Sequence, residues 1–146
     1  MIHIDIIAVG KLRDKALLSL WQNYTKQLQW PLALYEIDAR KPDGIEEKIL
    51  EKINPRSHLF ILDERGKSLP SPDFAKKLED ITTNGISTIQ FIIGGADGLS
   101  DKIRQKADFL LSFGVQTWPH MLVRIMLAEQ IYRARQILAG HPYHRE

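Results

Sequence analysis

The sequence contains no cysteine, which excludes a disulfide framework, a thiolate metal site and a cysteine nucleophile. It also lacks a long apolar run. The N-terminal stretch IHIDIIAV (2–9) is too short to cross a membrane, and no positively charged segment precedes it as in a signal peptide. We therefore expect a cytoplasmic protein that has no membrane partner.

Two glycine-containing loops lack the spacing that nucleotide-binding motifs require. The tripeptide GKS (66–68) resembles the end of a P-loop, but the first glycine of that motif is replaced by Ile61, and Leu-Pro follows where a helix should continue. The glycines of IIGGADG (92–98) do not have the spacing of the dinucleotide fingerprint G-x-G-x-x-G. We therefore exclude binding of a nucleoside triphosphate at the first loop.

A strong overall charge is missing too, because 20 lysines and arginines oppose 18 acidic residues and leave a net charge of +2. The excess is nevertheless local. Residues 1–108 carry 16 residues of each sign, whereas residues 109–146 carry four arginines and two acids. Arginine presents a flat, bidentate fork that suits phosphate. A solvated helix face is the simpler interpretation of this charge, and a phosphate-binding surface is the alternative.

Short apolar runs alternate with helical patterns along the chain. This alternation, with strands that are apolar almost without interruption, is typical of an α/β domain whose parallel-dominated sheet carries helices on both faces. We predict a single domain, 1–146, without a repeat or a linker. The predicted strands are 2–9, 32–38, 58–62, 87–93 and 109–113. The predicted helices are 14–30, 43–53, 72–83, a short helix after Ser100, and 120–139. Ser71 and Ser100 are expected to cap the helices that follow them.

Three loops leave predicted strands and should lie at the carboxyl edge of the sheet, where parallel sheets bind ligands. They span 63–70, 94–99 and 114–119. The first is typical of a polar surface loop. In the second, Gly94-Gly95 would let a ligand approach the backbone, although a glycine pair can equally serve only to turn the chain. In the third, Trp118 supplies a flat apolar wall.

The predicted helix 120–139 begins with HMLVRIML, which is apolar around the whole helix circumference. A helix that is apolar all round is buried on every side, so one side should face the sheet and the other a second subunit. Arg124 lies inside this apolar band and needs an acid, backbone carbonyls or a bound phosphate as its partner. Glu129 and Arg133 are four positions apart in the favourable order and should form an ion pair.

The chain ends in GHPYHRE (140–146), where Gly140 should end the helix and the rest has the side chains of an active site. Terminal residues usually fray and carry little chemistry, so this composition is unusual. A metal site built on His141 and His144 is one interpretation. It lacks a third ligand, and the helical H-E-x-x-H pattern is absent.

Three segments carry a family resemblance: LDERGK (62–67), FIIGGADGLS (91–100) and TWPHMLVRIMLAEQIYRARQILAGHPYHRE (117–146). With them, the whole chain resembles the SPOUT-class ribosomal RNA large subunit methyltransferase H family. The resemblance implies transfer of a methyl group from S-adenosylmethionine to N3 of a pseudouridine in 23S ribosomal RNA, without a metal. It also implies a deep trefoil knot, a homodimer and an assembled ribosome or its 23S RNA as partner.

The resemblance further suggests the roles of individual residues. S-adenosylmethionine would be bound by Leu62, Gly94, Gly95, Phe113, Gly114, Val115, Gln116, Thr117 and Trp118. Catalytic roles would belong to His144, Tyr143 and Arg124. His144 is the first candidate for a proton acceptor, and catalysis by positioning alone is the rival. The expected RNA contacts are Arg133, Arg135, His141 and Arg145. In a dimer packed through 120–139, the tail of one subunit would reach the partner's cofactor loops.

A non-catalytic ribosome-binding module is the alternative function. It would use the same arginines and tail, but it would need neither the glycine pair nor the Trp118 wall. Binding of S-adenosylmethionine therefore separates the two interpretations.

Overall fold

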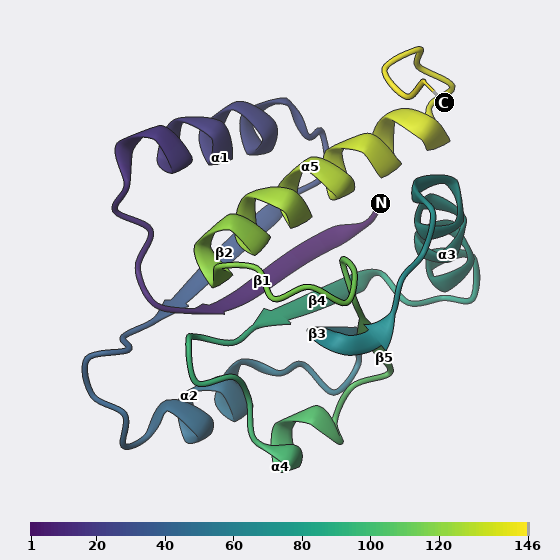
Figure 1. Cartoon of the computed structure of the whole chain (residues 1–146). Helices are drawn as coiled ribbons and strands as arrows, with labels where there is room; N and C mark the ends of the chain where they lie inside the picture. Colours follow the sequence, from purple (N-terminus) through teal and green to yellow (C-terminus); the bar gives the residue numbers. More distant parts are fainter. Residues whose placement is uncertain (146) are drawn as a thin grey trace.

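The computed structural model describes residues 1–145 and is built on one five-stranded sheet (Figure 1). The strands lie in the order β2-β1-β4-β3-β5, and every neighbouring pair is parallel. Their bounds are β1 His3–Val9, β2 Leu32–Ile37, β3 His58–Lys67, β4 Thr88–Ile93 and β5 Phe109–Leu111. The predicted parallel sheet is thus confirmed, and all five strands end at the same edge.

Helices cover both faces of the sheet, as predicted. Their bounds are α1 Lys15–Gln27, α2 Ile45–Lys52, α3 Ser71–Thr83, α4 Asp101–Arg104 and α5 His120–Leu138. One core cluster joins α1, α3 and α5 to the sheet through Trp21, Phe74 and Ile131. The cluster on the opposite face contains Ile49 of α2 and Ile103 of α4. No helix within 1–145 is long and apolar enough to cross a membrane.

The uninterrupted apolar character of β1 follows from this sandwich of layers. Ile4 and Ile6 lie in the first core cluster, whereas Ile7 and Val9 lie in the second. Successive side chains of a strand point to opposite faces, so a strand covered on both faces must be apolar at nearly every position.

The predicted loop at 63–70 is wrong in its first half, because β3 continues to Lys67. After a register shift, Lys67 lies beside Leu111 of β5, and its carbonyl accepts a hydrogen bond from the Ser112 N–H at 3.0 Å. The polar sequence DERG (63–66) does not predict a strand. The extension depends on pairing with β5, which lies more than 40 residues further along the chain.

Smaller differences concern the helix ends. Ser100 caps α4 as predicted, accepting from the Ile103 N–H at 3.4 Å. Ser71 does not cap α3: the helix begins at Ser71 itself, and its hydroxyl donates to Gln130 Oε1 of α5 at 2.7 Å. The first helix also ends earlier than predicted, at Gln27.

Gly66→Ala should destabilise the fold. A Cβ built at Gly66 would lie 2.5 Å from the Leu110 carbonyl oxygen, so β3 and β5 would have to separate. We expect a loss of about 2 kcal/mol in the free energy of unfolding, which is typical of overpacking. Denaturant unfolding measures it, and the exposed neighbour Ser68→Ala is the control, with a change within about 0.5 kcal/mol. Equal stability of the two variants would contradict the close strand contact.

Candidate functional site: a cleft at the strand exits

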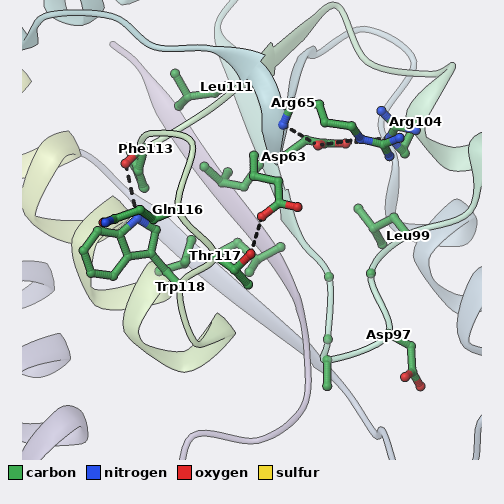
Figure 2. A pocket seen from close by; sticks show the side chains of 18 of the residues that line it. Asp63, Arg65, Asp97, Leu99, Arg104, Leu111, Phe113, Gln116, Thr117 and Trp118 are labelled. Carbon is green, nitrogen blue, oxygen red and sulfur yellow. Dashed lines mark hydrogen bonds and ion pairs between the residues drawn. The ribbon is translucent and has the colours of Figure 1, made fainter.

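A cleft of about 510 Å³ lies at the carboxyl edge of the sheet, between the second half of β3 and the segments that follow β4 and β5 (Figure 2). The three predicted exit loops all contribute to its walls. Eight of the nine predicted cofactor residues line it, namely Leu62, Gly94, Gly95, Phe113, Gly114, Gln116, Thr117 and Trp118. The ninth, Val115, is not among the lining residues, and 92% of it is exposed to solvent.

The glycine pair has a packing role that the sequence did not reveal. A Cβ at Gly94 would lie 2.9 Å from Leu99 Cγ and 3.2 Å from the Gly98 carbonyl carbon, and a Cβ at Gly95 would lie 3.0 Å from Val9 Cγ1. The loop after β4 therefore folds closely onto itself and onto the end of β1. Both glycines are needed to shape this wall of the cleft, whatever the cleft binds.

The third loop is held by bonds to its own residues. The buried Ser112 hydroxyl accepts from the Gly114 N–H at 3.0 Å and donates to the Gly114 carbonyl at 2.7 Å. Gly114 has φ +114°, a conformation that side-chain-bearing residues rarely adopt. The Trp118 indole N–H donates to the Phe113 carbonyl at 3.3 Å, so the predicted aromatic wall is fixed in place.

Charged side chains on two sides of the cleft were missed as site residues, because DER (63–65) was interpreted as part of a surface loop. Asp63 accepts from Arg104 Nε at 2.6 Å and also pairs with Arg65 at 3.5 Å (Figure 2). Burial alone would raise the pKa of Asp63, but the bonds from the Arg65 N–H and from Arg104 outweigh it and lower the pKa. Glu64 Oε2 accepts from the Thr117 hydroxyl at 2.6 Å and so connects two loops of the cleft. The sequence signal for these site residues is the run of three charged residues directly after the apolar stretch of β3.

Arg124 does not lie in the cleft. It is 1% exposed, and its guanidinium donates to Glu36 Oε2 at 2.5 Å and to the Gly10 carbonyl at 3.0 Å. The predicted acid and carbonyl partners are thus confirmed. Both bonds lie inside the fold and give the guanidinium a structural role, and its catalytic role stays a prediction.

The start of the tail is fixed by the end of α5. Gly140 has φ +72°, its N–H donates to the Ile137 carbonyl, and the His141 N–H donates to the Gln136 carbonyl at 2.9 Å. This is the pattern of a Schellman motif. Gly140 therefore ends the helix as predicted and turns the tail back along it.

The tail packs on its own helix. The Tyr143 ring meets Tyr132 edge-on with ring centroids 4.8 Å apart, and its hydroxyl donates to Glu129 Oε2 at 3.2 Å. Burial, followed by the nearby Glu129 charge, raises the pKa of Tyr143 to about 12, so the phenol stays protonated at neutral pH. His144 Nδ1 lies 3.1 Å from Arg133 Nη1.

Within one chain, the tail and the cleft lie apart. The cleft loop ends just before α5, whereas the tail follows the other end of this 19-residue helix, which corresponds to about 28 Å (Figure 1). None of the described tail residues, 141–145, lines the cleft. The structure therefore does not bring the predicted catalytic residues His144 and Tyr143 to the predicted cofactor residues of the same chain.

The four predicted RNA contacts are unequally available. Arg133 forms the predicted ion pair with Glu129 at 3.0 Å and also contacts His144, so its guanidinium is already engaged. Arg135 donates to Gln29 at 2.8 Å. The His141 ring accepts from the Tyr143 N–H, and Arg145 is exposed.

Part of the apolar surface of α5 is only half-buried. Ile125, Leu127 and Ile131 are buried in the core. Met121, Leu122, Val123 and Met126 are not, so the prediction of burial on every side does not hold for a single chain. Val123 lines the cleft and Met121 lies against Gly10, so Leu122 and Met126 are the two of these four that a second subunit would cover.

Comparison with known proteins identifies the family. A family model described as a predicted SPOUT methyltransferase matches residues 2–144. The chain belongs to the SPOUT methyltransferase family. Two curated relatives bear the name ribosomal RNA large subunit methyltransferase H. The one from Rhodospirillum centenum is 50% identical, and the match covers 96% of this chain and 97% of the relative. The one from Zymomonas mobilis is 44% identical, with 98% of both chains covered.

Solved structures support the SPOUT fold at much lower sequence identity. A SpoU methyltransferase, AviRb from Streptomyces viridochromogenes, was solved in complex with AdoMet and matches with a TM-score of 0.52 and 12% identity. The match covers 94% of this chain and 61% of AviRb. A probable methylase family protein from Haemophilus influenzae gives a TM-score of 0.58 at 12% identity, covering 98% and 70% of the two chains. The trefoil knot stays a prediction of the resemblance.

The positions of histidine and acidic side chains do not support a metal site in the tail. Within residues 1–145, no three histidine or acidic side chains come together in a group that could hold a metal ion. His141 and His144 instead contact the Tyr143 backbone and Arg133.

Arg124→Met should destabilise this SPOUT domain, since it removes the ion-pair partner of the Glu36 carboxylate and the donor to the Gly10 carbonyl. We expect the free energy of unfolding to fall by about 3 kcal/mol, which is at the lower end for a broken buried ion pair. The lower end applies because the Glu36 side chain is 28% exposed. Arg135→Met in the same helix is the control and should cost within about 0.5 kcal/mol in denaturant unfolding. If Arg124→Met instead keeps wild-type stability and loses only enzymatic activity, the guanidinium is catalytic after all.

Proposed function

We propose that this chain transfers a methyl group from S-adenosylmethionine to ribosomal RNA of the large subunit, at N3 of a pseudouridine. The observation that carries the proposal is the cleft at the strand exits, lined by eight of the nine predicted cofactor residues in a SPOUT chain. The names of its relatives specify the large-subunit ribosomal RNA as their substrate. The choice of pseudouridine as the target nucleotide and of N3 as the methylated atom rests on the family resemblance of the sequence.

The cleft fits such a methyl donor in size and in composition. Its volume of about 510 Å³ lies in the usual range for small-molecule sites. Gly94 and Gly95 leave the β4 exit loop without side chains, Leu62 and Trp118 supply apolar walls, and Asp63 and Glu64 supply carboxylates. A bound sulfonium donor provides an already activated methyl group, so the protein has to hold the two reactants in line and exclude water.

The reaction needs one proton to leave. The bond between the sulfonium sulfur and the methyl carbon breaks as the bond from N3 to that carbon forms, and the N3 proton passes to an acceptor. A guanidinium can only donate, so His144 Nδ1 accepts from Arg133, and a neutral ring then carries its proton on Nε2. In this arrangement His144 has no nitrogen free to accept. We propose that His144 acts once its bond to Arg133 opens, with positioning alone as the rival.

The active unit that we propose is a homodimer packed through α5. The half-buried Leu122 and Met126 of the helix would be covered by the partner, and the tail would complete the partner's cleft. Two observations support this arrangement. The tail follows the end of α5 that lies away from the cleft of its own chain (Figure 1). The tail is also ordered by packing on Tyr132 and Glu129, which gives it a defined direction.

Cells that lack this chain should lose one N3-methylpseudouridine from 23S ribosomal RNA, as measured by mass mapping of nucleosides. The wild-type gene should restore it, and Gly94→Val should not, because a side chain there forces Leu99 and Gly98 away and deforms the cleft. Calorimetry should show that Gly94→Val weakens S-adenosylmethionine binding at least tenfold. Ser68→Ala, an exposed position outside the cleft lining, is the control and should bind normally.

Unchanged nucleosides in the deleted cells would contradict the proposed activity. A wild-type protein that binds ribosomes and not S-adenosylmethionine would indicate the non-catalytic module instead.

Deleting residues 141–146 should abolish methyl transfer while the protein still sediments as a dimer. Because Tyr143 packs on Tyr132, the deletion also uncovers part of α5, and a modest drop in thermal stability is expected. The decisive test mixes tail-deleted subunits with Gly94→Val subunits. If the tail acts across the dimer, each heterodimer contains one intact tail facing one intact cleft and regains activity. Inactive mixtures with proven heterodimers, or an active monomer, would contradict the shared site.

A further inference from the structure

The loop between β1 and α1 holds basic side chains in fixed outward positions. Leu12 is 7% exposed, and its N–H donates to Glu36 Oε2 at 2.8 Å, the same oxygen that binds the buried Arg124. Its neighbours Lys11 and Arg13 are exposed. With Leu12 fixed inward, the two cations on either side of it are held toward solvent.

This loop lies at the edge of the cleft. It follows Val9, whose side chain would touch a Cβ at the cleft residue Gly95, at 3.0 Å. Gly10 packs against α5 just as closely, since a Cβ there would lie 3.0 Å from Met121 and 3.5 Å from His120. His120 begins the helix two positions after Trp118 of the cleft. The loop therefore adjoins both the part of the cleft formed after β4 and the part formed by the segment before α5.

The three cations of residues 11–15 outnumber the one carboxylate of this segment, Asp14. Within residues 1–145, Lys11, Arg13 and Lys15 form no ion pair, and the nearby Asp14 is used as the cap of α1, accepting from the Leu17 N–H at 3.0 Å. Lys15 is the first residue of α1, where the helix dipole disfavours a cation, and the first turn has no acidic residue. An anion bound at this place would relieve the repulsion.

Several other arginines of the chain, including two that line the cleft, are already engaged in ion pairs. Arg104 binds Asp63, and Arg65 is paired with the same carboxylate. In the next exit loop, after β2, Arg40 binds Asp38 at 2.8 Å. The C-terminal candidates Arg124 and Arg133 bind Glu36 and Glu129. Lys11 and Arg13 of the β1–α1 loop and Lys15 at the start of α1 have no such ion pair within residues 1–145.

We infer that Lys11, Arg13 and Lys15, here termed the basic rim, bind the phosphate backbone of the substrate RNA next to its target nucleotide. This inference rests on the proposed function and names the surface that holds its substrate. Lysine and arginine on an exposed, anchored loop are the usual phosphate contacts of RNA-binding proteins. A nucleotide that enters the cleft brings its flanking phosphates to the cleft edge, where the basic rim lies.

The test compares two double variants on large ribosomal subunits from cells that lack the chain. Lys11→Gln with Arg13→Gln should weaken binding by on the order of tenfold and lower the slope of log K against log salt by about 2. S-adenosylmethionine affinity should not change, and the rate at saturating subunits should recover. The control is Lys26→Gln with Arg56→Gln, which are exposed, unpaired within 1–145 and remote from the strand exits. It should bind as wild type does.

A photoreactive side chain at position 13 identifies the partner, and its crosslink should be to ribosomal RNA. If the rim variant binds and methylates subunits as well as wild type, or if the crosslink is to a ribosomal protein, the inference is wrong and the proposed function stands. If wild type neither binds nor methylates the subunits, the proposed function and the basic rim both fail.

Discussion

The parallel arrangement of all five strands is the constraint on which the rest of this structure depends. Parallel neighbours cannot be joined by tight turns, so each strand is followed by a crossover, and all strands end at one edge. The second half of β3 and the loops after β4 and β5, which are distant in sequence, are thereby brought together around one cleft. The same arrangement buries both faces of the sheet, which uses almost every strand side chain for packing. The side chains that can bind a ligand are therefore found mainly at the carboxyl ends of the strands and in the loops that follow them.

A buried charged residue, Arg124, connects the segments at the carboxyl edge of the sheet. Arg124 of α5 reaches Glu36 at the end of β2 and Gly10 at the end of β1, and Glu36 also binds the Leu12 N–H. A buried guanidinium is expensive without such partners, so these bonds hold the start of α5 at one position. The cleft loop precedes that helix directly. The basic rim and the part of the cleft formed by the segment before α5 are therefore positioned by the same pair of charges.

The far end of α5 has a second polar cluster, which binds the tail. Glu129 accepts from both Arg133 and Tyr143, and Arg133 lies over the Tyr143 ring at 4.8 Å and beside His144. These contacts hold the tail side chains on their own helix in the isolated chain. Any role of the tail in catalysis therefore requires a second subunit, a release of these bonds, or both.

The sequence by itself determined the α/β class, the parallel sheet, the family and most of the cleft. These follow from local signals: apolar runs of strand length, helix ends such as Gly140, and motifs next to strand ends. Tertiary structure decided the rest, because it depends on partners far apart in the chain. The extension of β3 requires β5, Ser71 bonds across to Gln130 instead of capping its helix, and Arg124 finds Glu36 88 positions away. The packing role of Gly94 likewise appears only once Leu99 and Gly98 fold back against it, since a glycine's neighbours in space are not written next to it in the chain.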